Sequence, residues 1–152
     1  MRRVVHVLGA LLILGILVAV ALPGYADYTT RASVSAALVF VAKGREALES
    51  SCSDGTFALR QKPGDIGLPE SEPKAYVYRT ELLRLAPNVV RLKTTLTDIY
   101  GRPFFGLFPW KVIPQGSILE YEFTCSAESK LSSKFAASTV EPKYLPASLR
   151  GQ

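Results

Sequence analysis

The hydrophobic side chains of this sequence are concentrated in one uninterrupted run near the N-terminus. Between Val4 and Ala26 there is no Asp, Glu, Lys or Arg, and residues 4–22 are nearly all Leu, Val, Ile, Ala or Gly. As a helix, residues 4–22 would be about 28 Å long, close to the ~30 Å hydrocarbon core of a bilayer. Because Arg2 and Arg3 precede the run, the positive-inside rule keeps the N-terminus in the cytoplasm. The pattern is that of a membrane anchor with the rest of the chain outside, of a cleaved signal peptide, or of the apolar half of a longer helix.

The helical pattern continues past this run and becomes amphipathic. Apolar residues recur at helical spacing along one stripe, at Val34, Leu38, Val41, Leu48 and Cys52. Charged residues occupy the opposite side, at Lys43, Arg45, Glu46 and Glu49. We therefore predict one helix from about residue 4 to about residue 51, kinked at Pro23 and Gly24, with Ser53-Asp54-Gly55 as its stop. Its apolar half is 1–26, and its amphipathic half, 27–52, packs on a globular domain.

Beyond the helix the pattern predicts a loop, a sheet and a tail. Residues 53–74 are rich in Gly, Pro and charge, which is typical of a connecting loop with a short ordered piece. Strand-like runs follow at 75–79, 89–96, 104–110 and 118–125, and the second and fourth alternate apolar with polar residues. The predicted fold class is α+β, with the long helix on an antiparallel sheet of about four strands over 75–125. Residues 126–152 are interpreted as a C-terminal loop on the sheet.

The two cysteines lie at opposite ends of this region, Cys52 at the helix end and Cys125 at a strand end. In an exported domain they would most simply form a disulfide. Two buried free thiols are the alternative.

Composition excludes several classes of protein. With 152 residues, 48% of them apolar, the chain is long enough for one ordinary domain and too apolar for global disorder. The net charge is +5, but without Arg2 and Arg3 the outer part carries only +3 (16 Lys and Arg against 13 Asp and Glu). Its one basic cluster is Arg91 with Lys93, so nucleic acid is not expected as the main partner.

Catalytic chemistry has few candidates. His6 is the only histidine and lies in the apolar run, so the outer domain has no Ser-His-Asp triad and no histidine metal site. Glu120 and Glu122 share a strand face, which we interpret as solvated rather than as a glycosidase pair. We expect no enzyme activity, no cofactor and no metal. The aromatic residues of one run are expected in the core, with an exposed adhesive patch as the alternative: Phe104, Phe105, Phe108 and Trp110.

The segment from Gly15 to Val34 resembles the N-terminal helix of type IV pilins, above all in its Ala-Leu-Pro-Gly-Tyr-Ala-Asp-Tyr stretch followed by Thr, Arg and Ala. Phe123-Thr124-Cys125 and the Lys-Tyr-Leu-Pro tail from Lys143 resemble later pilin motifs. The resemblance implies a lollipop fold and a non-enzymatic subunit that polymerises through its helix into a pilus for adhesion, twitching motility and DNA uptake. It implies other pilin subunits, the inner membrane and the pilus assembly machinery as partners.

Two positions depart from the pilin pattern. In the register set by Pro23, the family's assembly carboxylate is replaced by His6, and the glycine before the prepilin cleavage site is replaced by Met1, followed by Arg2. Because of these departures, a pilin-like subunit that stays in the membrane without polymerising remains an alternative. A second alternative is a secreted periplasmic binding domain whose signal peptide is cleaved after Ala26, where Gly24-Tyr25-Ala26 is a small-x-small site.

Overall fold

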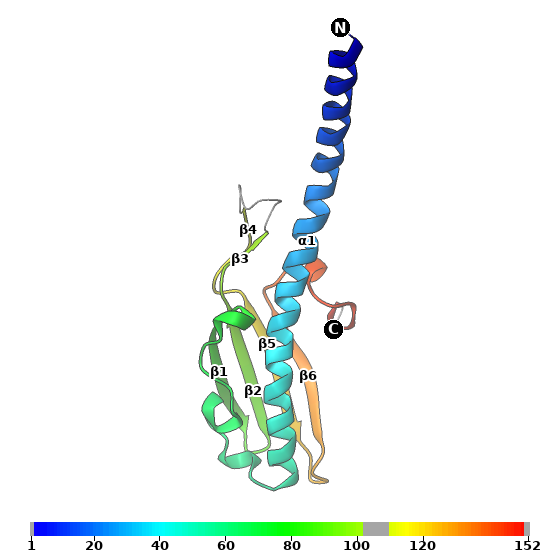
Figure 1. The fold of residues 1–152 in the computed structure, drawn as a ribbon. Helices are drawn as coiled ribbons and strands as arrows, with labels where there is room; N and C mark the ends of the chain where they lie inside the picture. Colours follow the sequence, from blue (N-terminus) through cyan, green and yellow to red (C-terminus); the bar gives the residue numbers. More distant parts are fainter. Residues whose placement is uncertain (1, 102–109, 151–152) are drawn as a thin grey trace.

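The N-terminal third of the chain forms one helix, α1 (Arg2–Ser53). The computed structural model describes residues 2–101 and 110–150, with the side chains of 4–19, 27–100 and 112–150. Figure 1 shows that the N-terminal part of α1 projects clear of the rest of the chain, whereas its C-terminal part lies along a sheet. The predicted helix is confirmed, and Gly55, with a left-handed φ of 70°, follows its end.

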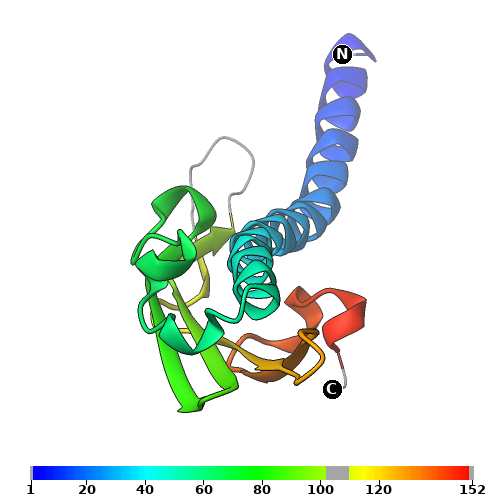
Figure 2. The ribbon, with the colours of Figure 1, turned by 90° about the horizontal axis from the view of Figure 1, so that it is seen from below.

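The helix is continuous across Pro23 and Gly24. Figure 2 shows that its N-terminal part runs in a different direction from the part on the sheet, so the helix bends along its length. The bend is not assigned to one residue, and the kink at Pro23 and Gly24 stays a prediction.

A four-stranded antiparallel sheet packs against the C-terminal part of α1 (Figure 1). Its order is β1-β2-β5-β6, and its strands are β1 (Val77–Ala86), β2 (Val89–Leu96), β5 (Ile118–Cys125) and β6 (Leu131–Ser138). β1 with β2 and β5 with β6 are antiparallel neighbours in sequence, and β2 pairs with β5 in the middle. The predicted fold class, α+β with a long helix on a four-stranded antiparallel sheet, is confirmed.

The fourth strand of the sheet, β6, lies outside the predicted strands. The sequence predicts a loop for residues 126–152, but Leu131–Ser138 form β6 at the edge of the sheet. Within the predicted strand 104–110, residues 104–109 lie outside the described residues. Trp110 begins β4 (Trp110–Ile113), which pairs with β3 (Ile99–Gly101) in a separate two-stranded sheet.

The core lies between one stripe of α1 and one face of the sheet. The predicted stripe is confirmed, because Val34, Val41, Leu48 and Cys52 are buried and Leu38 is partly buried. The sheet contributes the alternate residues of its two central strands, Val90, Leu92, Leu96, Leu119 and Phe123. We call residues 30–52 of α1 the docked segment.

Two arginines fix the connection between α1 and β1 through hydrogen bonds. It contains three short 3₁₀ turns, η1 (Phe57–Leu59), η2 (Pro63–Ile66) and η3 (Pro73–Ala75). The Arg84 guanidinium on β1 donates to the carbonyl oxygens of Phe57, at 2.9 Å, and Arg60, at 2.6 Å. Arg60 in turn donates to Ser51 Oγ at 3.0 Å. The predicted loop is therefore ordered through hydrogen bonds to both the sheet and the helix.

Candidate functional site

The N-terminal part of α1 is an apolar cylinder that this chain leaves uncovered. Every residue from 4 to 19 is exposed, and the group contains only Val, Leu, Ile, Ala and Gly besides His6. We call residues 4–19 the projecting segment. Leu12, for example, is 67% exposed, and Val5 is 65% exposed. Among the described residues, no stretch of helix has the length and hydropathy needed to cross a membrane.

Within the projecting segment, His6 lies one turn from the start of α1 and is exposed. Gly9 and Gly15 follow on the same segment, and a Cβ atom at either position would have no atom within 4 Å. Small residues on an open helix surface permit close approach of another helix. Neither glycine is needed for packing within this chain.

The predicted disulfide between Cys52 and Cys125 is confirmed. The two Cα atoms are 5.7 Å apart, within the usual range for a bridged pair. The bond joins the last turn of α1 to the end of β5, at the end of the domain opposite the projecting segment (Figure 1). A disulfide of this kind is typical of an oxidising compartment outside the cytoplasm.

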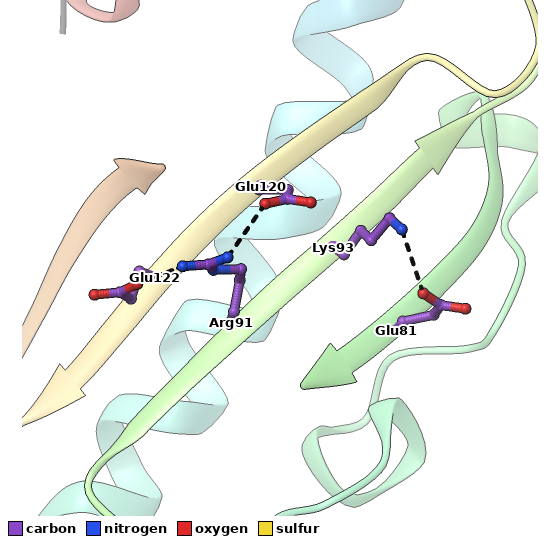
Figure 3. A network of polar contacts seen from close by, with 5 residues as sticks. All are labelled: Glu81, Arg91, Lys93, Glu120 and Glu122. Atoms are coloured by element: carbon purple, nitrogen blue, oxygen red, sulfur yellow. Dashed lines mark hydrogen bonds and ion pairs between the residues drawn. The ribbon is translucent and has the colours of Figure 1, made fainter. Parts of the chain in front are cut away.

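The predicted acidic pair is part of an ion-pair network on the sheet face that points away from α1 (Figure 3). Arg91 of β2 lies 3.7 Å from Glu120 and 3.0 Å from Glu122, so one guanidinium bridges both carboxylates. Lys93 lies 3.9 Å from Glu81 of β1. Both members of the predicted basic cluster are thus paired with acids, which supports a structural, partly solvated face.

Tyr121 separates the two glutamates in sequence and faces the other side of the sheet. Its ring packs with those of Phe123 and Phe135, at centroid distances of 6.3 Å and 5.1 Å. Burial raises the pKa of Tyr121 to about 12, from an ordinary value that already leaves the hydroxyl protonated at neutral pH. It is a partly buried residue that packs against the core.

Three of the predicted aromatic residues, Phe104, Phe105 and Phe108, lie outside the described residues, as does the side chain of Trp110. In the part of the chain that the structure describes, no three His, Cys, Asp or Glu side chains are grouped as metal ligands would be. The expectation that the chain needs no cofactor stays a prediction.

The structure brings together three tyrosines that the sequence pattern does not connect. Tyr28 of α1, Tyr76 after η3 and Tyr100 of β3 line a hollow of about 290 Å³, together with Thr29, Ala32 and Ser33 of α1. Tyr28 is 71% exposed and Tyr100 is 44% exposed. We call these three residues the tyrosine collar. The sequence indicates only part of this collar. Tyr28 closely follows the apolar run, whereas Tyr76 and Tyr100 come close to Tyr28 only in the folded domain.

Comparisons with known proteins find no match: no family model, no curated protein and no solved structure is similar to this chain.

Proposed function

We propose that this protein is a type IV pilin-like structural subunit, anchored in the inner membrane by the apolar half of α1 and associating with other subunits through that same half. One observation carries the proposal. A single helix buries the docked segment on the sheet of its own chain and leaves the projecting segment exposed on every side. The pilin-like α+β architecture and the disulfide support it.

The exposed surface has to be covered for a physical reason. Removing a Val, Leu or Ile side chain from water stabilises a protein by about 1.5–3 kcal/mol. The projecting segment has such residues all round the helix, and the uncharged run continues in the sequence from residue 19 to Ala26. A cost of this size, repeated along the segment, favours an apolar surrounding over water. A bilayer supplies it before assembly, and the same segment of neighbouring subunits supplies it afterwards.

Association between projecting segments is supported by Gly9 and Gly15. Both are open on the surface of α1, and small residues let helix backbones approach closely in an apolar medium. The role is structural, so we propose no reaction and no bound cofactor. Nucleic acid is not part of the proposal, because Arg91 and Lys93 are already paired with acidic side chains.

A secreted domain with a cleaved signal peptide is less well supported. Cleavage after Ala26 would cut α1 within its continuous helical span. The remaining alternative, a pilin-like subunit that stays in the membrane without polymerising, is favoured by His6. An imidazole in the position of the family's carboxylate cannot form the anion–amine pair that the pilin resemblance implies for assembly.

A charge placed in each segment tests the membrane part of the proposal. The full chain is expressed in a bacterium, and membranes are extracted with alkaline carbonate. We expect the parent chain to stay in the membrane pellet and Leu12→Lys to shift toward the soluble fraction, because a lysine at the centre of a spanning helix is unfavourable. Val39→Lys is the matched control: Val39 is 60% exposed on the outer side of the docked segment. A parent chain that is fully extracted would refute the anchor.

Shearing of intact cells separates the two pilin-like roles. If the subunit polymerises, the sheared extracellular fraction contains the chain in high-molecular-weight filaments. If the chain is found only in the membrane, the non-polymerising alternative holds. His6→Glu then asks whether restoring an acid at this position increases the filament fraction.

A further inference from the structure

We propose that the tyrosine collar is a membrane-surface contact: Tyr28 and Tyr100 lie in the headgroup layer of the bilayer, and Tyr76 supports them from the wall of the hollow. This inference rests on the proposed anchoring of α1. It adds a second contact with the membrane, made by the globular domain itself.

The position of the collar along α1 fits this layer. The uncharged run from Val4 to Ala26 would be about 33 Å long as a helix, slightly more than the ~30 Å hydrocarbon core. Tyr28 lies two residues, or about 3 Å, beyond that run. The polar layer on each side of the core is several ångströms thick, so Tyr28 falls inside it.

The fold brings the other two tyrosines to the same hollow, beside Tyr28 and the next two turns of α1. β3 and η3 both contact α1, and Figure 1 shows β3 beside the helix at the end of the domain from which the projecting segment leaves. The hollow is lined by Tyr28 of α1 together with Tyr76 and Tyr100 of the globular domain. A bilayer surface at the level of Tyr28 would therefore meet the exposed Tyr28 and Tyr100, with the partly buried Tyr76 behind them in the wall of the hollow.

The local structure holds the two sheet-side tyrosines in place. The Tyr100 hydroxyl donates to Asp98 Oδ2 at 3.3 Å, and Asp98 Oδ1 accepts the Gln115 backbone N–H at 2.6 Å. Tyr76 has a left-handed φ of 58°, which is unfavourable for a bulky side chain. The Tyr76 carbonyl accepts the Thr97 N–H at 2.9 Å, so the fold maintains this conformation. Backbone strain of this kind is retained most often at functional positions, and here it falls on a partly buried tyrosine in the wall of the hollow.

The chemistry of the collar matches that of a lipid headgroup layer. Tyrosine and tryptophan are enriched at membrane–water interfaces, because an apolar ring and a polar group can each find a matching surrounding there. Arg31 is exposed on α1 one turn after Tyr28, where its guanidinium can reach lipid phosphates. The collar is also continuous with the projecting segment, which the proposed function already places in the bilayer.

Depth-dependent fluorescence quenching tests this contact. The full-length chain is reconstituted in phosphatidylethanolamine–phosphatidylglycerol vesicles containing lipids brominated either near the headgroup or deep in the acyl chain. Trp110, the one tryptophan, is replaced by Phe in the background, and single tryptophans are introduced as Tyr28→Trp, Tyr100→Trp, Leu14→Trp and Leu59→Trp. Leu59 is the matched surface control, because it is 73% exposed in η1, near the opposite end of the domain. If the background does not fold, the parent emission of Trp110 is subtracted instead.

We expect shallow bromines to quench Tyr28→Trp and Tyr100→Trp, deep bromines to quench Leu14→Trp, and neither to quench Leu59→Trp. Quenching of Leu14→Trp without quenching at positions 28 and 100 would refute the collar and leave the anchor intact. Loss of quenching at all positions would refute the anchor as well. An unquenched Tyr28→Trp whose emission shifts to the blue as protein concentration rises would assign the collar to a subunit contact and overturn the membrane contact.

Discussion

The two ends of α1 have the same backbone structure and opposite relations to water. In the docked segment the buried apolar residues form one stripe, and Leu48, within that stripe, is 0% exposed. In the projecting segment they cover all sides and are all exposed. The stripe is covered by this chain, whereas the all-round apolar surface has to be covered by something else. We therefore expect substitutions in the docked segment to change the stability of the domain and substitutions in the projecting segment to change membrane attachment and assembly.

The largest expected effect comes from the disulfide at the end of the docked segment. Cys52 and Cys125 are 73 residues apart, and opening a loop of that size destabilises a domain by about 4 kcal/mol in the loop-entropy model. We expect Cys52→Ser with Cys125→Ser to lower the free energy of unfolding by about this amount, measured by denaturant titration in detergent. Retention of the variant in carbonate-washed membranes is the control. A variant with unchanged stability would show that the bond does not hold α1 on the sheet.

Leucine truncation compares the two segments directly. Leu48→Ala leaves a cavity in the core and should cost about 2–5 kcal/mol of unfolding free energy. Leu12→Ala removes the same atoms from an exposed position and should leave that free energy nearly unchanged. Denaturant titrations of both variants in the same detergent measure the difference. Equal losses would contradict the division of α1 into two functional parts.

Glycine substitutions provide a finer test. A Cβ atom at Gly44 would lie 2.7 Å from Leu68 Cδ1, whereas Gly15 has open space around it. Both substitutions gain helix propensity, but only Gly44→Leu also overpacks the contact with Leu68. Gly44→Leu should therefore destabilise the domain by about 1–3 kcal/mol relative to Gly15→Leu. Gly15→Leu should instead weaken helix–helix association, measured by cross-linking in membranes. A Gly44→Leu domain as stable as the Gly15→Leu domain would show that Leu68 moves aside at little cost in free energy.

The smallest expected effect is a pH-dependent change in the free energy of unfolding, and it comes from Asp65 in the connection between α1 and β1. Asp65 Oδ2 accepts the backbone N–H groups of Gln61 and Lys62, both at 2.9 Å, and these bonds hold the pKa of Asp65 below its usual range. A carboxyl whose pKa is lower in the folded state stabilises the fold above its unfolded pKa and loses that effect as pH falls through the folded pKa. We expect Asp65→Asn to be less stable than the parent at neutral pH and equal to it in strong acid. Glu70→Gln, an exposed change in the same connection, is the control; a gap independent of pH would contradict this origin.

Periodicity predicted the elements in which one face is buried. The stripe on the docked segment and the alternation in 89–96 and 118–125 are strong because burial selects the apolar residues at fixed spacing. β6 has no such signal: its sequence is Leu-Ser-Ser-Lys-Phe-Ala-Ala-Ser, and only Phe135 is buried. Its strand structure comes from pairing with β5 and from the edge-on contact between Phe135 and Tyr121.

The candidate site was predictable only where it is local in sequence. The projecting segment is one continuous run, and the disulfide joins the only two cysteines, so both follow from the chain itself. The tyrosine collar joins residues 28, 76 and 100, whose proximity depends on how η3 and β3 pack against α1. No residue pattern encodes that packing, so the collar required the structure.

The most direct test of the central claim is the intact mass of the protein isolated from cell membranes, measured with and without reductant. We predict a chain that retains the projecting segment, whole or trimmed by a few residues, and a mass gain of about two daltons on reduction of the Cys52–Cys125 bond. A chain that begins at Asp27 would lack the apolar half of α1 altogether and would contradict the account.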